Sequence, residues 1–214
     1  MTRRSFLAAA FSSAILAGGT QPSLAEIRSA IFAGGCFWCV EADFDKVPGV
    51  VSTVSGYAGG ATQNPTYRNY SSGGHREVVK IDFDDSKVSY ERLAEIFFRT
   101  VDPTDAGGQF CDRGESYSTA IYALDDAQKT AAEKAKSDAD AALSGKVVTP
   151  VLPAATFWPA EDYHQDYYRS DERILSRFGL VKKKDAYKGY RQGCGRDARV
   201  RQVWGEAAFT GIGK

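Results

Sequence analysis

The sequence has no excess of charge of either sign, and it has no apolar run of membrane length after its first 25 residues. Lysine plus arginine number 27, as do aspartate plus glutamate, so the formal net charge of the 214 residues is zero. This balance excludes a broad electrostatic footprint for nucleic acid, and we expect partners that are neutral molecules or ordinary protein surfaces. The chain also lacks internal repeats and low-complexity tracts, and its length suits one domain with a hydrophobic core.

Methionine and histidine are both scarce. The one methionine is Met1, and the two histidines are His75 and His164. The lack of methionine after residue 1 fits an oxidising setting, because methionine side chains are readily converted to the sulfoxide there. Two histidines could suggest a cysteine–histidine catalytic pair. We instead predict supporting roles for both, His75 in loop structure and His164 beside a pocket.

The first 25 residues predict an exported protein. Arg3-Arg4 is followed by a mostly apolar stretch, and Ser23-Leu24-Ala25 supplies the small residues that signal peptidases recognise. The two arginines fit a twin-arginine address, and an ordinary secretory start is the alternative. We therefore predict a signal peptide over residues 1–25 and a mature domain over residues 26–214. That domain is expected to be periplasmic or secreted, free of the membrane and monomeric.

Hydrophobic periodicity and turn residues predict a single α+β domain, a two-layer sandwich of sheet and helices. Strands are expected over residues 29–33, 50–57, 76–83 and 119–124, with a proline-interrupted edge strand from residue 147. Helices are expected from Cys36, after the capping residue Ser89, over 126–144 and around 195–204, with a short aromatic helix over 161–170. Long loops over 58–74 and 103–116 would supply the active site, and the rest of the C-terminal tail is expected to be irregular.

The cysteines carry the first chemical signal. Cys36-Phe37-Trp38-Cys39 forms a C-x-x-C motif directly after two glycines, at the predicted start of a helix. A helix N-terminus offers partial positive charge and free N–H groups, which favour the reactive thiolate of Cys36. A metal site is disfavoured, because Cys111 and Cys194 are isolated and form no second C-x-x-C.

An ordered series of motifs extends this signal along the chain. It comprises Gly34-Gly35-Cys36-Phe37-Trp38 with Glu41, Pro48-Gly49-Val50, Gly56-Tyr57-Ala58-Gly59-Gly60, Asn64-Pro65-Thr66-Tyr67, Gly74-His75-Arg76-Glu77, Asp112-Arg113-Gly114 with Tyr117, and Glu161-Asp162-Tyr163-His164-Gln165. The series resembles the peptide methionine sulfoxide reductase A family and covers about residues 29 to 170. The resemblance implies an enzyme without cofactor or metal that reduces the S epimer of methionine sulfoxide, in proteins and as the free amino acid.

The resemblance also implies a role for each matching residue. Cys36 would attack the sulfoxide sulfur while Glu77 donates a proton to the oxygen, which requires that burial raise the pKa of Glu77. Tyr67 and Tyr117 match phenol donors, and Asp112 matches a position that supports the hydrogen bonding of the pocket. Phe37 and Trp38 resemble the apolar wall that receives the S-methyl group. Taken singly, each of these side chains could instead be an ordinary core or surface residue.

The reaction would leave Cys36 as a sulfenic acid, which a second thiol can capture as a disulfide. We predict that Cys194 resolves it, because Cys194 lies in a glycine-flanked tail segment that resembles the resolving region of part of the family. Cys39 is the alternative, three residues from Cys36. Cys111 is expected to be a passive thiol, with a relay role left open. A thioredoxin-like protein would reduce the final disulfide.

Two other functions remain as alternatives. A thiol–disulfide oxidoreductase could use Cys36 and Cys39 as thioredoxin does, although the bulky Phe37-Trp38 pair is a poor surface for docking protein disulfides. A non-enzymatic secreted domain could carry two structural disulfides, although a chain of this length needs none for stability. A map of the cysteine pairs before and after exposure to substrate distinguishes these alternatives from the reductase.

Overall fold

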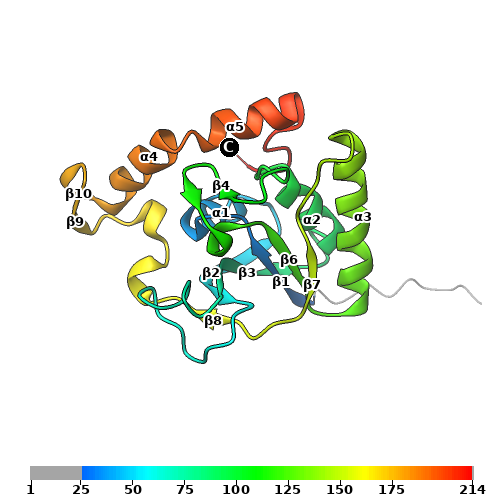
Figure 1. Ribbon diagram of the computed structural model, residues 1–214, viewed down its shortest axis with the longest axis horizontal. Helices are drawn as coiled ribbons and strands as arrows, with labels where there is room; N and C mark the ends of the chain where they lie inside the picture. The colour runs from blue at the N-terminus through cyan, green and yellow to red at the C-terminus, as the bar shows by residue number, and fades with distance from the viewer. Residues whose placement is uncertain (1–25, 214) are drawn as a thin grey trace, which may run out of the picture.

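A six-stranded mixed sheet forms the centre of the computed structural model, which describes residues 26–213 (Figure 1). The strands lie in the order β7-β6-β1-β3-β2-β8, and all neighbours are antiparallel except β6 and β7. The strands are β1 Ile27–Ala33, β2 Val50–Ala58, β3 Arg76–Asp84, β6 Ala120–Ala123, β7 Val151–Pro153 and β8 Trp158–Pro159. The predicted signal peptide, residues 1–25, lies outside the described residues.

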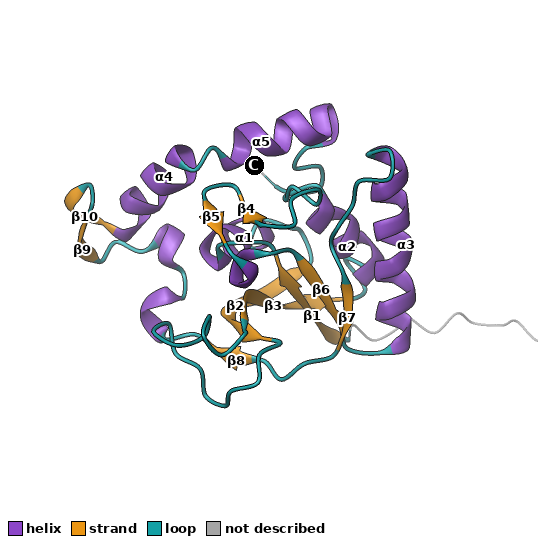
Figure 2. Ribbon diagram, in the orientation of Figure 1, coloured by secondary structure: helices purple, strands orange, loops and turns teal. Residues whose placement is uncertain are grey.

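Helices cover one face of this sheet. The helix α1 (Phe37–Phe44) packs on β2 and β3, and α2 (Tyr90–Phe98) packs against α3 (Asp126–Ala142), as Figure 2 shows beside the sheet. Phe32 of β1 lies between the rings of Phe44 and Phe97, and all three side chains are fully buried. Ser89 and Asp125 cap α2 and α3 by accepting hydrogen bonds from backbone N–H groups. The predicted sheet-and-helix layering is therefore confirmed.

The other face of the sheet carries a smaller apolar cluster. Ile31, Val78 and Tyr122 are buried there, and Leu152 of β7 packs against them together with Ala155 and Phe157 from the chain between β7 and β8. The edge strand lies at the predicted edge of the sheet but begins after Pro150, because the N–H of Val148 donates to the carbonyl of Pro103 instead of to a strand. Within the described residues, no helix is both long and apolar enough to span a membrane.

The C-terminal segment is more regular than the sequence predicts. The hairpin β9 (Arg173–Ser176) and β10 (Gly179–Lys182) leads into α4 (Lys183–Gly193) and α5 (Arg196–Trp204), and only α5 was predicted. We refer to residues 173–204 as the C-terminal arm; it runs along one side of the molecule in Figure 1. The sequence of α4 is polar and contains glycine, so its helix depends on tertiary contacts such as the burial of Tyr187 near Cys39.

Two further expectations differ from the structure in detail. The aromatic segment predicted as one short helix forms two 3-10 turns, η2 (Asp162–His164) and η3 (Tyr167–Arg169). The loop predicted over 103–116 contains a small hairpin, β4 (Gly108–Gln109) and β5 (Asp112–Arg113), followed by the 3-10 turn η1 (Glu115–Tyr117); a last 3-10 turn, η4, spans Gly205–Ala207. Short aromatic and glycine-rich segments have no clear hydrophobic periodicity, so the sequence does not distinguish a helix or a loop from 3-10 turns and a small hairpin.

Candidate active site

Cys36 lies at the N-terminus of α1, directly after the Gly34-Gly35 turn that ends β1. Gly35 has a φ of +80°, and a Cβ there would lie 2.6 Å from Cβ of Gln109, so this tight turn requires glycine. The turn places Cys36 at a cavity of about 60 Å³, which we call the Cys36 cavity. It is lined by Cys36, Phe37, Trp38, Tyr67, Glu77, Asp112, Tyr117 and Tyr190. All except Tyr190 are residues that the sequence predicts for the site.

Glu77 is the buried acid of this cavity. Its carboxylate lies on β3 and is 2% exposed. One oxygen accepts a hydrogen bond from the backbone N–H of Phe37 at 2.9 Å, and the other accepts one from the hydroxyl of Tyr70 at 2.9 Å. Burial nevertheless outweighs these bonds and raises the pKa of Glu77 to about 8. Glu77 is therefore largely protonated at neutral pH, as the sequence analysis requires of an acid catalyst.

Tyr70 is a member of the site that the sequence analysis missed. Its hydroxyl donates to Glu77 and lies 3.1 Å from the hydroxyl of Tyr117, so it joins the acid to one of the predicted phenol donors. Burial raises the pKa of Tyr70, which keeps its proton available. The only signal in the sequence was its place three residues after Tyr67, in the long loop before β3.

Tyr117 and Tyr67 reach the cavity from two different loops. Burial raises the pKa of Tyr117 to about 12 and also raises that of Tyr67, so both phenols stay protonated and can donate. A hydrogen bond from the backbone N–H of Tyr67 to the carboxylate of Glu161, at 3.0 Å, helps to fix the position of Tyr67. Glu161 also accepts from the hydroxyl of Tyr57 at 3.0 Å, which ties this loop to β2.

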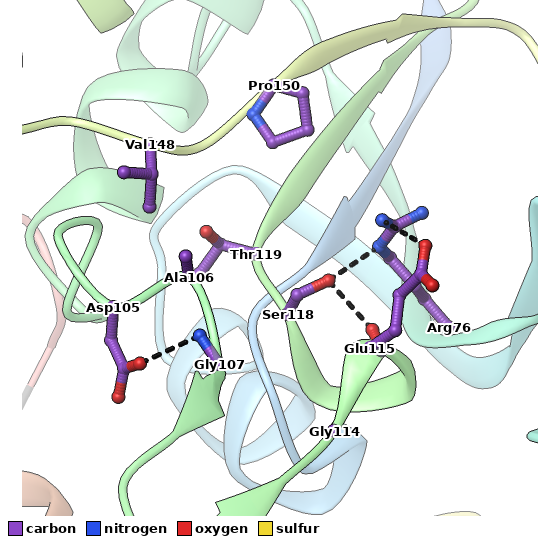
Figure 3. A pocket seen from close by; sticks show the side chains of 10 residues that line it. All are labelled: Arg76, Asp105, Ala106, Gly107, Gly114, Glu115, Ser118, Thr119, Val148 and Pro150. Carbon is purple, nitrogen blue, oxygen red and sulfur yellow. Dashed lines mark hydrogen bonds and ion pairs between the residues drawn. The ribbon is translucent and has the colours of Figure 1, made fainter.

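A second cavity, of about 390 Å³, lies behind the turn that carries Tyr117. Figure 3 shows Arg76 donating to the hydroxyl of Ser118 at 2.8 Å and pairing with Glu115 at 3.2 Å. Arg76 precedes Glu77 on β3, and Ser118 follows Tyr117. This network therefore ties the strand that carries Glu77 to the turn that carries Tyr117, a contact that the sequence does not reveal.

The apolar wall of the Cys36 cavity is a stack of aromatic rings. Trp38 stacks on Tyr167 with ring centroids 3.8 Å apart, and Phe37 packs against His164 at 5.0 Å. His164 is 2% exposed, neither ring nitrogen has a hydrogen-bond partner, and burial lowers its pKa to about 4. A neutral ring without partners acts as packing, which agrees with the predicted support role. His75 also matches its predicted loop role, since it accepts from the N–H of Gly60.

Cys39 lies beneath Cys36 on the same helix. The two side chains belong to one buried cluster, with Cys36 at 7% and Cys39 at 2% exposure. Burial raises the pKa of Cys36, whereas interaction with the Cys36 thiol and the nearby charges of Arg196 and Arg191 lower the pKa of Cys39. Cys36 is the N-cap residue of α1, as the sequence predicts, and the stabilisation of its thiolate by this position stays a prediction.

The other two cysteines form a disulfide. Cys111, at the turn of the β4–β5 hairpin, is bonded to Cys194 at the end of α4. Cys111 is thus not the passive thiol that the sequence predicts, and neither sulfur lines the Cys36 cavity. With Asp112 they form the one cluster of possible metal ligands found within residues 26–213, but their sulfurs are joined to each other. The resolving role of Cys194 stays a prediction.

Asp112 links this disulfide to the cavity. Its carboxylate is half-buried and accepts a hydrogen bond from the hydroxyl of Tyr190. Burial raises the pKa of Asp112, although the bond from Tyr190 opposes the effect. The site therefore combines a nucleophilic sulfur, a protonated buried carboxyl and two phenol donors in a small aromatic cavity, a set suited to reducing a small polar group on an apolar side chain.

Comparisons with known proteins agree with this geometry. The peptide methionine sulfoxide reductase family matches residues 28–204. A peptide methionine sulfoxide reductase MsrA 2 of Rhizobium meliloti is 54% identical over 188 residues, which cover 88% of this chain and 89% of the relative. A protein of the same name from Caulobacter vibrioides is 47% identical over 193 residues, covering 88% of this chain and 92% of the relative.

Solved structures show the same fold. Methionine sulfoxide reductase A of Corynebacterium diphtheriae aligns with a TM-score of 0.59 and 32% identity, covering 69% of this chain and 75% of that one. Mxr1 of Saccharomyces cerevisiae in its reduced form aligns with a TM-score of 0.62 and 24% identity, covering 73% of this chain and 92% of that one. Family, relatives and fold agree with the cysteine chemistry of the site: the chain belongs to the peptide methionine sulfoxide reductase MsrA family and reduces methionine sulfoxide with a thiol.

Proposed function

We propose that Cys36 attacks the sulfur of methionine sulfoxide while Glu77 donates a proton to the sulfoxide oxygen. The observation that carries this assignment is the buried carboxyl of Glu77, whose pKa is raised to about 8 at the wall of the Cys36 cavity. The sulfur–oxygen bond of the substrate breaks, and the oxygen ends on Cys36 as a sulfenic acid. The substrate sulfur gains two electrons and becomes a thioether, and the Cys36 sulfur loses two.

The remaining residues of the cavity bind and orient the substrate. Tyr67 and Tyr117 donate hydrogen bonds to the oxygen, which withdraw electron density as the sulfur–oxygen bond weakens. Phe37 and Trp38 contact the S-methyl group. The activity is that of a peptide-methionine (S)-S-oxide reductase, and protein-bound and free methionine sulfoxide are both proposed substrates.

Cys39 is the better placed of the two residues that could resolve the sulfenic acid. It lies in the same buried cluster as Cys36, and interaction with the Cys36 thiol lowers its pKa. Its thiolate can attack the Cys36 sulfur and displace the sulfenic hydroxyl, which takes up a proton and leaves as water. Cys194 would first have to leave its bond with Cys111. The arrangement therefore favours the alternative of the sequence analysis over Cys194.

A dithiol must then reduce the Cys36–Cys39 bond to complete the cycle, and a thioredoxin-like protein is the proposed partner. The protein is proposed to act in the periplasm or outside the cell as a soluble monomer, after removal of residues 1–25. This location rests on the pattern of the N-terminal sequence, including its two arginines. Isolation of a chain from cells that begins at Met1 would contradict it.

Disulfide mapping after one turnover tests the resolving step. The chain with free Cys36 and Cys39 is mixed with one equivalent of methionine sulfoxide, quenched by alkylation and digested. We expect a new Cys36–Cys39 peptide and an unchanged Cys111–Cys194 peptide. Cys36→Ser is the control and should form no new bond. A Cys36–Cys194 peptide, together with loss of turnover in Cys194→Ser but not in Cys39→Ser, would assign the resolving role to Cys194.

A further inference from the structure

The Cys111–Cys194 disulfide joins the two surface elements that flank the Cys36 cavity. Cys111 and Cys194 are 83 residues apart in sequence, and their Cα atoms are 4.9 Å apart. The β4–β5 hairpin that carries Cys111 pairs only two residues in each strand. A hairpin of this size has little stability of its own, so its position depends on what it is attached to.

A hydrogen bond joins the same two elements as the disulfide. Tyr190 precedes Cys194 by one turn of α4, since the N–H of Cys194 donates to the carbonyl of Tyr190 at 2.9 Å. The hydroxyl of Tyr190 donates to Asp112, the residue next to Cys111. Cys111 and Asp112, which are consecutive in the hairpin, are thus bound to Cys194 and Tyr190, which lie one helical turn apart at the end of α4. One link is covalent and the other is a charge-assisted hydrogen bond.

Both polar partners of this second link line the Cys36 cavity. Tyr190 packs edge-on to Trp38, with ring centroids 6.2 Å apart and an interplanar angle of 83°. Asp112 lies on the same cavity wall. Displacement of α4 from the hairpin would remove Tyr190 from Trp38 and leave the half-buried Asp112 without its donor. The shape of the cavity therefore depends on an attachment that the chemistry of Cys36 does not itself need.

We propose that Tyr190 is a substrate-binding residue and that the Cys111–Cys194 disulfide is a positioning element, which holds Tyr190 and Asp112 at the Cys36 cavity through successive turnovers. This proposal rests on the proposed function and extends it to the side of the cavity formed by the C-terminal arm. Tyr190 completes the aromatic wall beside Trp38 and contacts the apolar part of the methionine sulfoxide side chain. The disulfide acts through substrate affinity and donates no electrons to the reaction.

The exposure of the four cysteines agrees with a chemical role for Cys36 and Cys39 and a positioning role for the Cys111–Cys194 disulfide. Cys36 and Cys39 are buried, whereas Cys111 is exposed and Cys194 is half-buried. A strong dithiol can therefore open the outer bond in the wild-type chain: two electrons and two protons pass to Cys111 and Cys194, and the dithiol becomes a disulfide. The wild-type chain can thus be compared with and without its bond and without any substitution.

The test uses single-turnover reduction of the S epimer of a blocked methionine sulfoxide by the full chain. Two wild-type samples are prepared, one with two free thiols and the outer disulfide intact, and one with four free thiols. Cys111→Ser, Cys194→Ser and the double variant accompany them. Opening the bond, by reduction or by substitution, is expected to raise the half-saturating substrate concentration about tenfold and to change the limiting rate less than twofold. The three cysteine variants should agree with one another.

Tyr190→Phe tests the hydrogen bond separately. It is expected to raise the half-saturating concentration about threefold in the chain with the disulfide and to have no effect in the double cysteine variant, since the two links act as one unit. Tyr168→Phe is the matched control, because Tyr168 also donates to a carboxylate, that of Asp45 at 2.7 Å, but does not line the cavity. It should leave both constants unchanged.

Three results would overturn the proposal. Equal half-saturating concentrations with and without the bond would show that it does not position the cavity. A change confined to Cys194→Ser would give Cys194 a role of its own. Conversion of two equivalents of sulfoxide by the four-thiol chain, against one by the two-thiol chain, would show that the outer pair supplies electrons. If the wild-type chain converts no sulfoxide in either form, the proposed function fails instead.

Discussion

The two sides of the Cys36 cavity are built from different parts of the chain and held by different forces. The first side, with Cys36, Phe37 and Glu77, comes from β3 and α1, where buried contacts fix every side chain. The second side, with Tyr190 and Asp112, comes from the C-terminal arm and a small hairpin that a disulfide joins. This difference suggests that the core side sets the rate of the chemical step, whereas the arm side sets affinity for the substrate.

The same contrast appears in how the arm is attached. Arg191 of α4 pairs with Asp43 of α1 at 2.9 Å, and Arg196 is buried with its guanidinium donating to the carbonyls of Gly34 and Thr100. The arm also packs Tyr187, Val200 and Trp204 against the core, but these polar links join it to the residues around the site, and a single substitution can remove each of them. The comparison can therefore be tested one link at a time.

The largest effect is expected from Glu77→Gln on the core side. The amide cannot donate the proton that the sulfoxide oxygen needs, so the limiting single-turnover rate should fall about 10²- to 10⁴-fold, with little change in the half-saturating concentration. The amide keeps the size of the carboxyl and can still accept from the N–H of Phe37. A fall of less than about threefold would remove Glu77 from the chemical step.

Asp43→Asn is expected to weaken the arm through stability. The substitution leaves Arg191 and the fully buried Arg196 without their shared carboxylate, which should lower the free energy of unfolding by about 3 kcal/mol. Asp138→Asn is the control, because it removes an exposed pair with Lys134 on α3 and should cost less than about 1 kcal/mol. Denaturant unfolding followed by tryptophan fluorescence measures both. Equal losses would contradict the account of a buried link.

Tyr70→Phe is expected to lower the limiting rate about tenfold, because it removes the hydroxyl between Glu77 and Tyr117. Tyr90→Phe is the control: Tyr90 is also buried, but its hydroxyl has no hydrogen-bond partner and lies outside the cavity. That variant should keep the wild-type rate. If Tyr70→Phe changes only the half-saturating concentration, Tyr70 belongs to substrate binding and not to the acid network.

The remaining predictions concern pH. Below its pKa of about 8 Glu77 keeps the proton it donates, so its contribution to the single-turnover rate should be lost as the pH rises through 8, whereas deprotonation of Cys36 acts in the opposite direction. Glu77→Gln should lose the dependence that comes from Glu77 and keep the one from Cys36. The free energy of unfolding also depends on the protonation of Glu77. The unfolded chain releases the Glu77 proton near 4.5 and the folded chain near 8, so the folded state becomes less stable as the pH rises through this window. Glu77→Gln should gain stability relative to wild type over that range, and a constant difference would contradict the raised pKa.

The core side could be predicted from the sequence, and the arm side largely could not. Cys36, Phe37 and Glu77 lie in motifs next to strands and a helix with clear periodicity, so their meeting follows from the fold. Tyr70 and Arg76 act through hydrogen bonds that join the loop before β3 and β3 itself to the turn around Tyr117, which no spacing reveals. The helix α4 has weak intrinsic propensity and forms against α1, and the pairing of Cys111 with Cys194 depends on that contact. Long-range links of this kind appear only in the structure.

The central claim, a Cys36 thiol that reduces one epimer of methionine sulfoxide, is tested most directly by single-turnover conversion of the separated S and R epimers of a blocked methionine sulfoxide. Wild type and Cys36→Ser are compared, with both chains checked for the same folded fluorescence. The account predicts conversion of the S epimer alone, at one equivalent per chain, and no conversion by Cys36→Ser. Conversion of the S epimer by Cys36→Ser, or of the R epimer by wild type, would contradict it.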